Sequence, residues 1–410
     1  MRVLFVTNRF PGVFTRGDQL RSFQQIRHLS KRHAITLLVF DKPSGDSRDL
    51  AQLEAWCERV IVAPRNPLGT AWRGLRACFT KQAFQVAIYD SVPASVALHS
   101  LLAQSNFDIA HVQLARLGPM LQRLAPLPCV LDMVDALSLN MARRGMLDRG
   151  PLGIVARMEA ARLAVFENEL SQQAAGVAIS SAVDRNRIGA GKAQLVNNGV
   201  DLELFPFVAG AAGRGAGLVF TGNLGYFPNV DAACWFSREV MPQLLQQVPD
   251  AHLQLVGARP AARLRRVASR SPGVELVGPV ESMHPFLARA AIAVVPLRSG
   301  SGQQLKMLEA MATGTPVVAT SQSSAGLRAK DGEHLLVADG AEEMTAAIVR
   351  LLGDPALRTR LATQARELVE REHSWEQSAH ELERLWIAVA TAASRNTVFV
   401  TPLPATAASL

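Results

Sequence analysis

Three features that together suit a phosphorylated ligand follow one another between residues 295 and 320. A Gly/Ser loop, RSGSG, leads into an expected helix that begins at about Gln303 and carries Lys306 and Glu309. Unpaired backbone N–H groups at a helix N-terminus, together with the helix dipole, favour a phosphate or diphosphate. Lys306 adds a positive charge. Glu309, three residues later on the same helical face, can accept the two hydroxyl protons of a ribose.

Apolar runs on both sides of this loop and helix predict one βαβ unit. Two interpretations of the unit stay open. In the first, the loop, Lys306 and Glu309 bind a nucleoside diphosphate. In the second, the loop only turns the chain and the two charged residues are solvated, because Gly-rich loops before helices are common in α/β proteins.

The length of the chain, 410 residues, exceeds one ordinary core and fits two domains of roughly 200 residues each. Apolar runs alternate with helical segments in both halves, which predicts parallel sheets covered on both faces and an α/β fold class. The expected strands of the first half lie near residues 2–7, 34–40, 59–63, 108–112, 128–132 and 175–179.

The motif LEAMATGTPVVAT at 308–320, with its preceding loop, resembles the donor-site signature of retaining GT-B glycosyltransferases of glycosyltransferase family 4, the glycosyl transferases group 1. The stretches RGDQLRSF and GNLGYFPNVDA are similar to the bacterial exopolysaccharide-associated branch. The resemblance covers nearly the whole chain. It implies a GT-B fold, in which two Rossmann-like domains with parallel sheets face each other across a cleft.

The resemblance also implies an activity. A sugar would pass from a nucleoside-diphosphate sugar, with retention at the anomeric carbon, to a glycan or lipid-linked acceptor in bacterial exopolysaccharide or cell-surface polysaccharide synthesis. No metal or other cofactor is expected. Two alternatives stay open: a GT-B nucleotide-sugar epimerase, and a non-enzymatic binder of anionic polymers.

Domain boundaries follow from the same resemblance. We place the acceptor-side domain at 1–200 and the nucleotide-sugar-binding domain at 201–374. In GT-B proteins the last helix crosses back to the first domain, and its expected position here is 375–393. Residues 394–410, with two prolines and small side chains, are expected to form a disordered tail.

In the second domain the resemblance implies that Lys306 and Glu309 serve catalysis. Asn229 stands near the position where many members carry a phosphate-binding lysine, so Lys306, Arg298 or the backbone must meet the diphosphate charge. Ser301 stands where many members carry a first glutamate. The expected donor-binding residues are Gly222, Asn223, Arg298, Gly300, Ser301, Gly302, Gln303, Gln304 and Leu305.

In the first domain, His111 lies at the end of the fourth expected strand, where open α/β sheets bind ligands. The resemblance implies that His111, or Gln113 in its place, hydrogen-bonds the transferred sugar; a buried structural histidine is the alternative. The loop after the first strand is expected to face the donor phosphates and the acceptor, unless it is an ordinary surface loop, and Asp135 either orients a hydroxyl or caps a helix. The expected acceptor or cleft residues are Arg16, Gly17, Asp18, Arg21, Gln113 and Asp135.

Positive charge is concentrated in the first half. Residues 1–200 hold 24 Lys and Arg against 15 Asp and Glu, a net charge of +9, whereas the remainder holds 19 against 20, a net charge of −1. An anionic membrane surface is one expected partner, through the basic and apolar stretches 72–84 and 140–170, and solvated or core-packed helices are the alternative. No nucleic-acid-binding module accompanies the charge, so no nucleic-acid partner is expected.

The apolar runs and the cysteines of the sequence predict the cellular compartment. The first apolar run is too short for a signal-peptide core, and no run of about 18 uncharged apolar residues occurs. The four cysteines are far apart, which fits a reducing compartment and argues against a structural zinc site. We therefore expect a cytoplasmic protein that meets a membrane, if at all, peripherally at the inner face of the plasma membrane.

Overall fold

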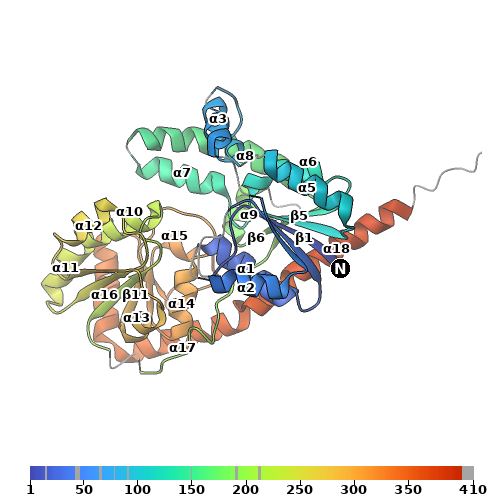
Figure 1. The fold of residues 1–410 in the computed structure, drawn as a ribbon. Helices are drawn as coiled ribbons and strands as arrows, with labels where there is room; N and C mark the ends of the chain where they lie inside the picture. Colours follow the sequence, from blue (N-terminus) through green and yellow to red (C-terminus); the bar gives the residue numbers. More distant parts are fainter. Residues whose placement is uncertain are drawn as a thin grey trace, which may run out of the picture.

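The structure is a computed structural model of the chain. It describes residues 1–13, 16–41, 47–63, 67–77, 79–89, 92–148, 150–189, 193–210 and 214–398. These residues form two parallel sheets with helices on both faces, and the two domains face each other (Figure 1). The predicted GT-B fold is confirmed.

The first sheet has seven strands in the order β3-β2-β1-β4-β5-β6-β7. Its central strands β1 and β4 are buried on both faces, as parallel strands under two helical layers must be. The strands are β1 (Arg2–Thr7), β2 (Ala34–Val39), β3 (Arg59–Val62), β4 (Ile109–Gln113), β5 (Cys129–Asp132), β6 (Gly176–Ile179) and β7 (Ala193–Leu195). The helices are α1 (Gly17–Leu29), α2 (Ser47–Trp56), α3 (Pro67–Ala77), α4 (Phe84–Ala87), α5 (Val92–Gln104), α6 (Pro119–Leu124), α7 (Leu137–Leu147), α8 (Pro151–Gln173) and α9 (Ala182–Ile188), with a 3-10 turn η1 (Ala115–Leu117).

The second sheet has six strands in the order β10-β9-β8-β11-β12-β13 and one continuous core. Its strands are β8 (Gly217–Thr221), β9 (His252–Val256), β10 (Val274–Gly278), β11 (Ile292–Val295), β12 (Val317–Ala319) and β13 (Leu336–Val337). The helices are α10 (Phe227–Trp235), the π-helix η3 (Phe236–Val240), α11 (Met241–Gln247), α12 (Ala262–Ala268), α13 (His284–Arg289), α14 (Leu305–Thr313), α15 (Ser321–Ser324), α16 (Ala341–Gly353) and α17 (Pro355–Glu372).

The last helix, α18 (Trp375–Val398), lies against α1, β5 and β6 of the first domain (Figure 1). Its Trp386 is fully buried in the core of that domain. Residues 394–398, expected in a disordered tail, belong to this helix, and 399–410 lie outside the described residues. No helix in the described part of the chain combines the length and the apolar character needed to cross a bilayer.

Candidate active site

The Gly/Ser loop ends in a helix N-terminus whose backbone donors are unengaged. Gly300 and Gly302 have φ values of 113° and 69°, a backbone region that only glycine adopts without strain. Helix α14 begins at Leu305, two residues later than expected, after an extended N-cap at Gln304. No described residue accepts a hydrogen bond from the amides of Gln304, Leu305 or Lys306. An anion placed there would meet several N–H groups and the positive end of the helix dipole.

Lys306 is buried at the base of this helix. Its Nζ donates to Asn229 Oδ1 at 2.6 Å and lies 4.3 Å from the centre of the Phe220 ring. Burial lowers the pKa of Lys306 to about 7, with the charge of Glu309 opposing that effect. Asn229, at the position where a lysine is common in the resembled family, therefore holds Lys306 in place.

Gly222, at the end of β8, has a close contact with the same amine. A Cβ at this position would lie 2.9 Å from Lys306 Nζ, and the φ of 138° is strained for any other residue. The next residue, Asn223, has a carbonyl that accepts from Asn229 Nδ2 at 2.9 Å. These two predicted donor-binding residues therefore lie directly beside Lys306.

Glu309 is partly exposed on α14, and its backbone carbonyl accepts from the Thr313 hydroxyl at 2.8 Å. No described residue donates to its carboxylate. Burial raises the pKa of Glu309 to about 7, with Lys306 acting in the opposite direction. The side chain is thus an available acceptor, one helical turn from the lysine.

Arg298, a candidate for the diphosphate, is already engaged. Its guanidinium makes two hydrogen bonds to Asp231, at 2.9 and 3.0 Å, and lies 5.4 Å from the Trp235 ring centre. A bidentate pair of this kind fixes the guanidinium in place. Its Nη1 donates to no described residue, so Arg298 stays a predicted donor for a phosphate beside Lys306 and the helix amides.

The loop is held from across the domain interface by carboxylates of the first domain. Ser301 Oγ donates to Asp135 Oδ2 at 2.5 Å, and the Gly302 amide donates to Asp184 Oδ2 at 2.9 Å. Burial and the nearby charge of Asp184 raise the pKa of Asp135 to about 6. A glutamate is common in the family at the position of Ser301. In this chain the serine at that position contacts Asp135 of the other domain.

Other contacts complete the interface. The guanidinium of Arg143 donates to Gly300 O at 2.6 Å, and the Asn198 amide donates to Gln303 Oε1 at 2.7 Å. Gly17 at the start of α1 lies against Leu305, since a Cβ on Gly17 would be 3.3 Å from Leu305 Cδ1. Residues predicted in both domains are thus brought together at the start of α14.

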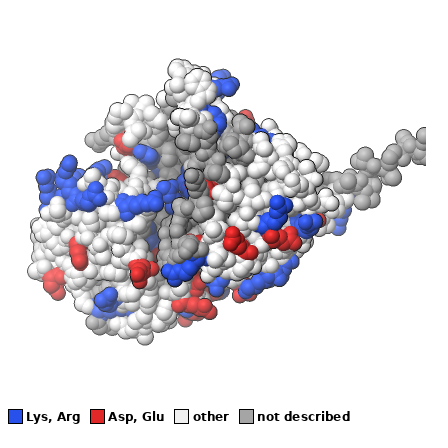
Figure 2. Space-filling view, viewed as in Figure 1, with Lys and Arg blue, Asp and Glu red and all other residues white. Residues whose placement is uncertain are grey.

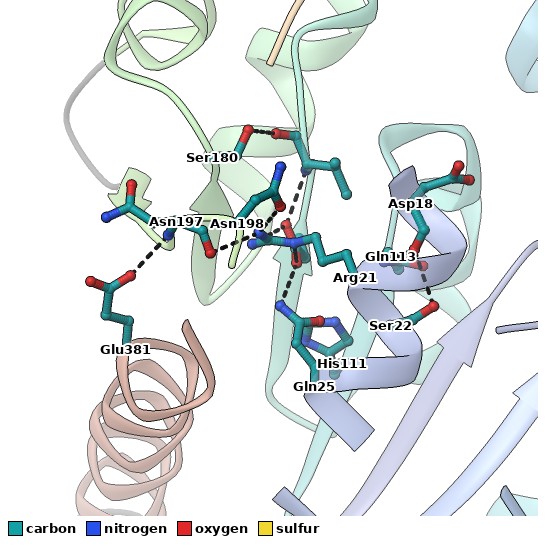
Figure 3. Close-up of polar contacts among 12 residues, drawn as sticks. Asp18, Arg21, Ser22, Gln25, His111, Gln113, Ser180, Asn197, Asn198 and Glu381 are labelled. Carbon is teal, nitrogen blue, oxygen red and sulfur yellow. Dashed lines mark hydrogen bonds and ion pairs between the residues drawn. The ribbon is translucent and has the colours of Figure 1, made fainter. Parts of the chain in front are cut away.

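Arg21, expected to face the acceptor, is fully buried and structural (Figure 3). Its Nε donates to Asp132 at 2.8 Å, and its Nη1 donates to Asn198 Oδ1 at 2.8 Å. The network joins α1 to β5 and to the segment that crosses into the second domain. Arg21 therefore holds these three segments together inside the protein. Its side chain is not exposed, so it is not placed to contact an acceptor.

The backbone after β5 is strained where it approaches the loop. Val134 has a φ of 63°, which is unusual for a β-branched residue. Its amide is held by Asp132 Oδ1 at 3.0 Å and its carbonyl by Ser180 Oγ at 2.6 Å (Figure 3). Strain that the surroundings enforce is typical of functional sites, and here it directs Asp135 at Ser301.

His111 lies in the middle of β4, opposite Phe5, and is fully buried. Its Nδ1 accepts from Trp386 Nε1 at 3.2 Å. Burial lowers the pKa of His111 to about 4, so the ring is neutral. As placed, the ring belongs to the core and fits the structural alternative better than a contact with the transferred sugar.

The remaining first-domain candidates lie at or beside the N-terminus of α1. Gln113 is buried, and its Nε2 donates to Asp18 O at 3.0 Å. The Asp18 carboxylate pairs with Arg9 at 2.6 Å. Arg16 is the exposed N-cap of α1 and makes no side-chain cap bond. Of this group, Arg16 is the residue with a side chain exposed to solvent.

Asp184 is a site residue that sequence reasoning missed. It is buried, it accepts from the Ala136 and Gly302 amides, and it bonds the Ser181 hydroxyl. The spacing Ser181-x-x-Asp184 is a helix-capping pattern, so sequence alone assigns it a local role. Within the described residues no group of three or more His, Cys, Asp or Glu side chains could hold a metal ion.

Comparisons with known proteins agree with this geometry. The family "Glycosyl transferases group 1" matches residues 215–354, the segment that holds Gly222, Lys306 and Glu309. This part of the chain is similar to glycosyl transferases group 1 domains. The match covers the second sheet and does not extend to the first.

Two curated relatives match parts of the chain. The phosphatidyl-myo-inositol mannosyltransferase of Mycobacterium leprae is 27% identical over 208 residues, covering 49% of this chain and 54% of that protein. The lipopolysaccharide core biosynthesis glycosyltransferase LpsE of Rhizobium meliloti is 32% identical over 142 residues, covering 33% and 41%. The matched part of the chain thus spans about half the length of these relatives.

Solved structures match over almost the whole chain. Sucrose-phosphate synthase from Thermosynechococcus elongatus has a TM-score of 0.72 at 19% identity and covers 95% of this chain and 99% of its own. Anabaena HepE in complex with UDP has a TM-score of 0.66 at 14% identity, covering 98% and 100%. At these identities the likeness establishes the fold.

Proposed function

We propose that the protein is a retaining glycosyltransferase that moves a sugar from a nucleoside-diphosphate sugar to a glycan or lipid-linked acceptor. The observation that carries the proposal is the start of α14, where unengaged amides, a buried lysine and an available carboxylate lie on the same helix. These groups match the diphosphate and the ribose of one donor molecule. Their position inside the group 1 segment supports the same assignment.

Each group has a distinct task in this proposal. The amides of Gln304 and Leu305 receive the diphosphate, while Glu309 accepts from the ribose hydroxyls. As the bond to the sugar breaks, charge grows on the leaving diphosphate, and donors already aimed at that position stabilise the transition state. Lys306 supplies the positive charge, and no metal is needed for this step.

The first domain supplies the acceptor side. Asp135 and Asp184 hold the loop by Ser301 and Gly302, so the amides left for the donor are those of the helix itself. The relatives named as glycolipid and lipopolysaccharide transferases, and the neighbour solved with UDP-glucose, support a nucleotide sugar and a cell-surface acceptor. Bacterial exopolysaccharide or cell-surface polysaccharide synthesis is the proposed setting.

The test is an incubation with a panel of nucleotide sugars, with and without lipid-linked and oligosaccharide acceptors. The expected result is release of a nucleoside diphosphate that depends on an acceptor, with the anomeric configuration of the donor kept in the product by NMR. Interconversion of the free nucleotide sugar without acceptor would instead identify an epimerase. No consumption of any donor under either condition would contradict both enzymatic proposals.

A further inference from the structure

Helix α3 presents its large apolar side chains to solvent. Leu68, Trp72 and Leu75 recur at the spacing of one helical face, and Phe79 continues that face just after the helix; all four are between 53% and 85% exposed. The opposite face of the helix carries small residues. Ala77 is buried there, and a Cβ at Gly74 would lie 3.2 Å from the Phe84 ring. The helix therefore packs through its small residues and leaves its apolar face outward.

The neighbouring helix α8 continues the same surface. Its Val155 and Met158 are each 56% exposed. Arg162, on the same helix, donates to Ala77 O at 3.3 Å, which places the end of α3 beside α8. We call the set Leu68, Trp72, Leu75, Phe79, Val155 and Met158 the apolar tip. It lies at the extremity of the first domain, where Figure 1 shows α3 above α8.

Positive charge borders the apolar tip. The stretch 67–84 contains Arg73, Arg76 and Lys81 and no acidic residue. Arg76 and Lys81 are exposed. Figure 2 shows the top of the molecule as mostly uncharged, with Lys or Arg side chains beside it. The arginines of the next stretch are used differently: Arg143, Arg157 and Arg162 all donate to carbonyl oxygens of the protein.

We propose that the apolar tip inserts into the surface of an anionic lipid leaflet. A protruding apolar helix face bordered by Lys and Arg is the arrangement of an interfacial membrane segment, in which apolar side chains enter the acyl boundary and the basic groups meet lipid phosphates. Large exposed apolar side chains gathered in one patch are typical of a surface that meets a partner or a membrane. The protrusion of α3 and the absence of acidic residues from 67–84 favour a lipid surface over a second protein.

The geometry also connects the apolar tip with the candidate site. Helix α7 starts beside Asp135, where the Gly/Ser loop is held, and ends near Met146, another exposed apolar residue. Helix α7 packs along α8, which carries Val155 and Met158 of the apolar tip. Insertion of the tip would therefore bring the helices beside the Gly/Ser loop toward the headgroups. Vesicle binding itself does not depend on the proposed transfer reaction.

The experiment is co-sedimentation of the full chain, without nucleotide, with vesicles of phosphatidylglycerol and phosphatidylcholine or of phosphatidylcholine alone. The wild type should bind the anionic vesicles. Trp72→Ser combined with Phe79→Ser should lower the bound fraction by about tenfold or more, because two large apolar side chains no longer enter the leaflet. Ile387→Ser, which removes an exposed apolar residue of α18, is the matched control and should bind as the wild type does.

Two further measurements separate the contribution of the basic residues to membrane binding from that of the apolar side chains. Arg76→Gln with Lys81→Gln should weaken binding and reduce its sensitivity to salt, because exposed charges are screened. The tryptophan emission should shift to the blue on vesicles in the wild type and not in Trp72→Phe, which should still sediment. Circular dichroism melting confirms that each variant is folded.

Three outcomes would overturn the proposal: no binding of the wild type to anionic vesicles, equal binding of the wild type and the Trp72/Phe79 double variant, or a wild-type dimer that the double variant loses. The last outcome would assign the apolar tip to a second copy of the chain. Transfer to a water-soluble acceptor should be the same in the double variant and the wild type. A failure of membrane binding is thereby distinguished from a failure of the proposed reaction.

Discussion

Replacing Glu309 by alanine tests whether its carboxylate holds the ribose of the donor. The side chain is partly exposed and accepts from no described residue, so its removal leaves no protein donor unpaired. The free energy of unfolding should change little. A hydrogen bond to a charged group contributes about 1.5 to 3 kcal/mol, so the dissociation constant of the nucleoside diphosphate should rise roughly 10- to 150-fold.

Isothermal titration calorimetry at about pH 8 measures this change. Burial raises the pKa of Glu309 to about 7, so the carboxylate is mostly ionised at that pH. Glu342→Ala is the matched control, because it removes an exposed carboxylate from the first turn of α16 in the same domain. It should bind as tightly as the wild type.

A 2′-deoxy nucleotide completes a double-mutant cycle between protein and ligand. The wild type should bind the deoxy form more weakly than the ordinary nucleotide, whereas Glu309→Ala should bind both alike. The cycle separates the ribose contact from any effect of Glu309 on the charge of Lys306. Equal discrimination by both proteins, or an unchanged affinity of Glu309→Ala for the ordinary nucleotide, would refute the assignment.

Four further predictions follow from the site and its support. Lys306→Met should lower kcat more than it weakens donor binding. Donor affinity of the wild type should peak near pH 7, because Lys306 loses charge above a pKa of about 7 and Glu309 loses charge below one of about 7; a profile unchanged in Lys306→Met would contradict this. His111 has a folded-state pKa of about 4, below its unfolded pKa of about 6.5. Its contribution to the free energy of unfolding is therefore complete above pH 6.5. The contribution is lost as the pH falls toward 4, by about 3 kcal/mol. Urea unfolding of His111→Gln should therefore vary less with pH over that range, with turnover nearly unchanged; a large loss of turnover in this folded variant would restore the expected hydrogen bond from His111 to the transferred sugar. Arg21→Met leaves the charge of Asp132 buried without its counter-ion and should cost about 3 to 5 kcal/mol in urea unfolding, partly recovered with Asp132→Asn; a loss below about 1 kcal/mol would contradict a buried pair.

The features that could be predicted from the sequence are those that local pattern determines. Continuous apolar runs such as 2–7 and 34–39 must lie between two helical layers, and the structure places strands there. Lys306 and Glu309 are neighbours because of their spacing on one helix. The glycines of the loop could be assigned because the turn needs positive φ values.

The features that could not be predicted depend on partners distant in sequence. Arg21 resembles a solvent-facing arginine until Asp132 and Asn198, more than 100 residues away, are placed around it. His111 lies near a strand end in the sequence, yet Trp386 of the last helix covers it.

Orientation is a second limit of sequence reasoning. An amphipathic pattern does not reveal which face is covered, and in α3 the apolar face is the outer one. Asp184 shows the same ambiguity for a polar residue. Its spacing from Ser181 satisfies a local cap, and the additional bond to Gly302 exists only because the two domains meet.

The most direct test of the donor site is amide hydrogen exchange across residues 299–306 with and without a saturating nucleoside diphosphate. The amides of Gln304, Leu305 and Lys306 have no acceptor among the described residues, so a bound diphosphate should slow their exchange, and Lys306→Met should weaken that protection. Protection confined to the first domain, or exchange in 299–306 unchanged by saturating ligand, would contradict the placement of the donor at α14.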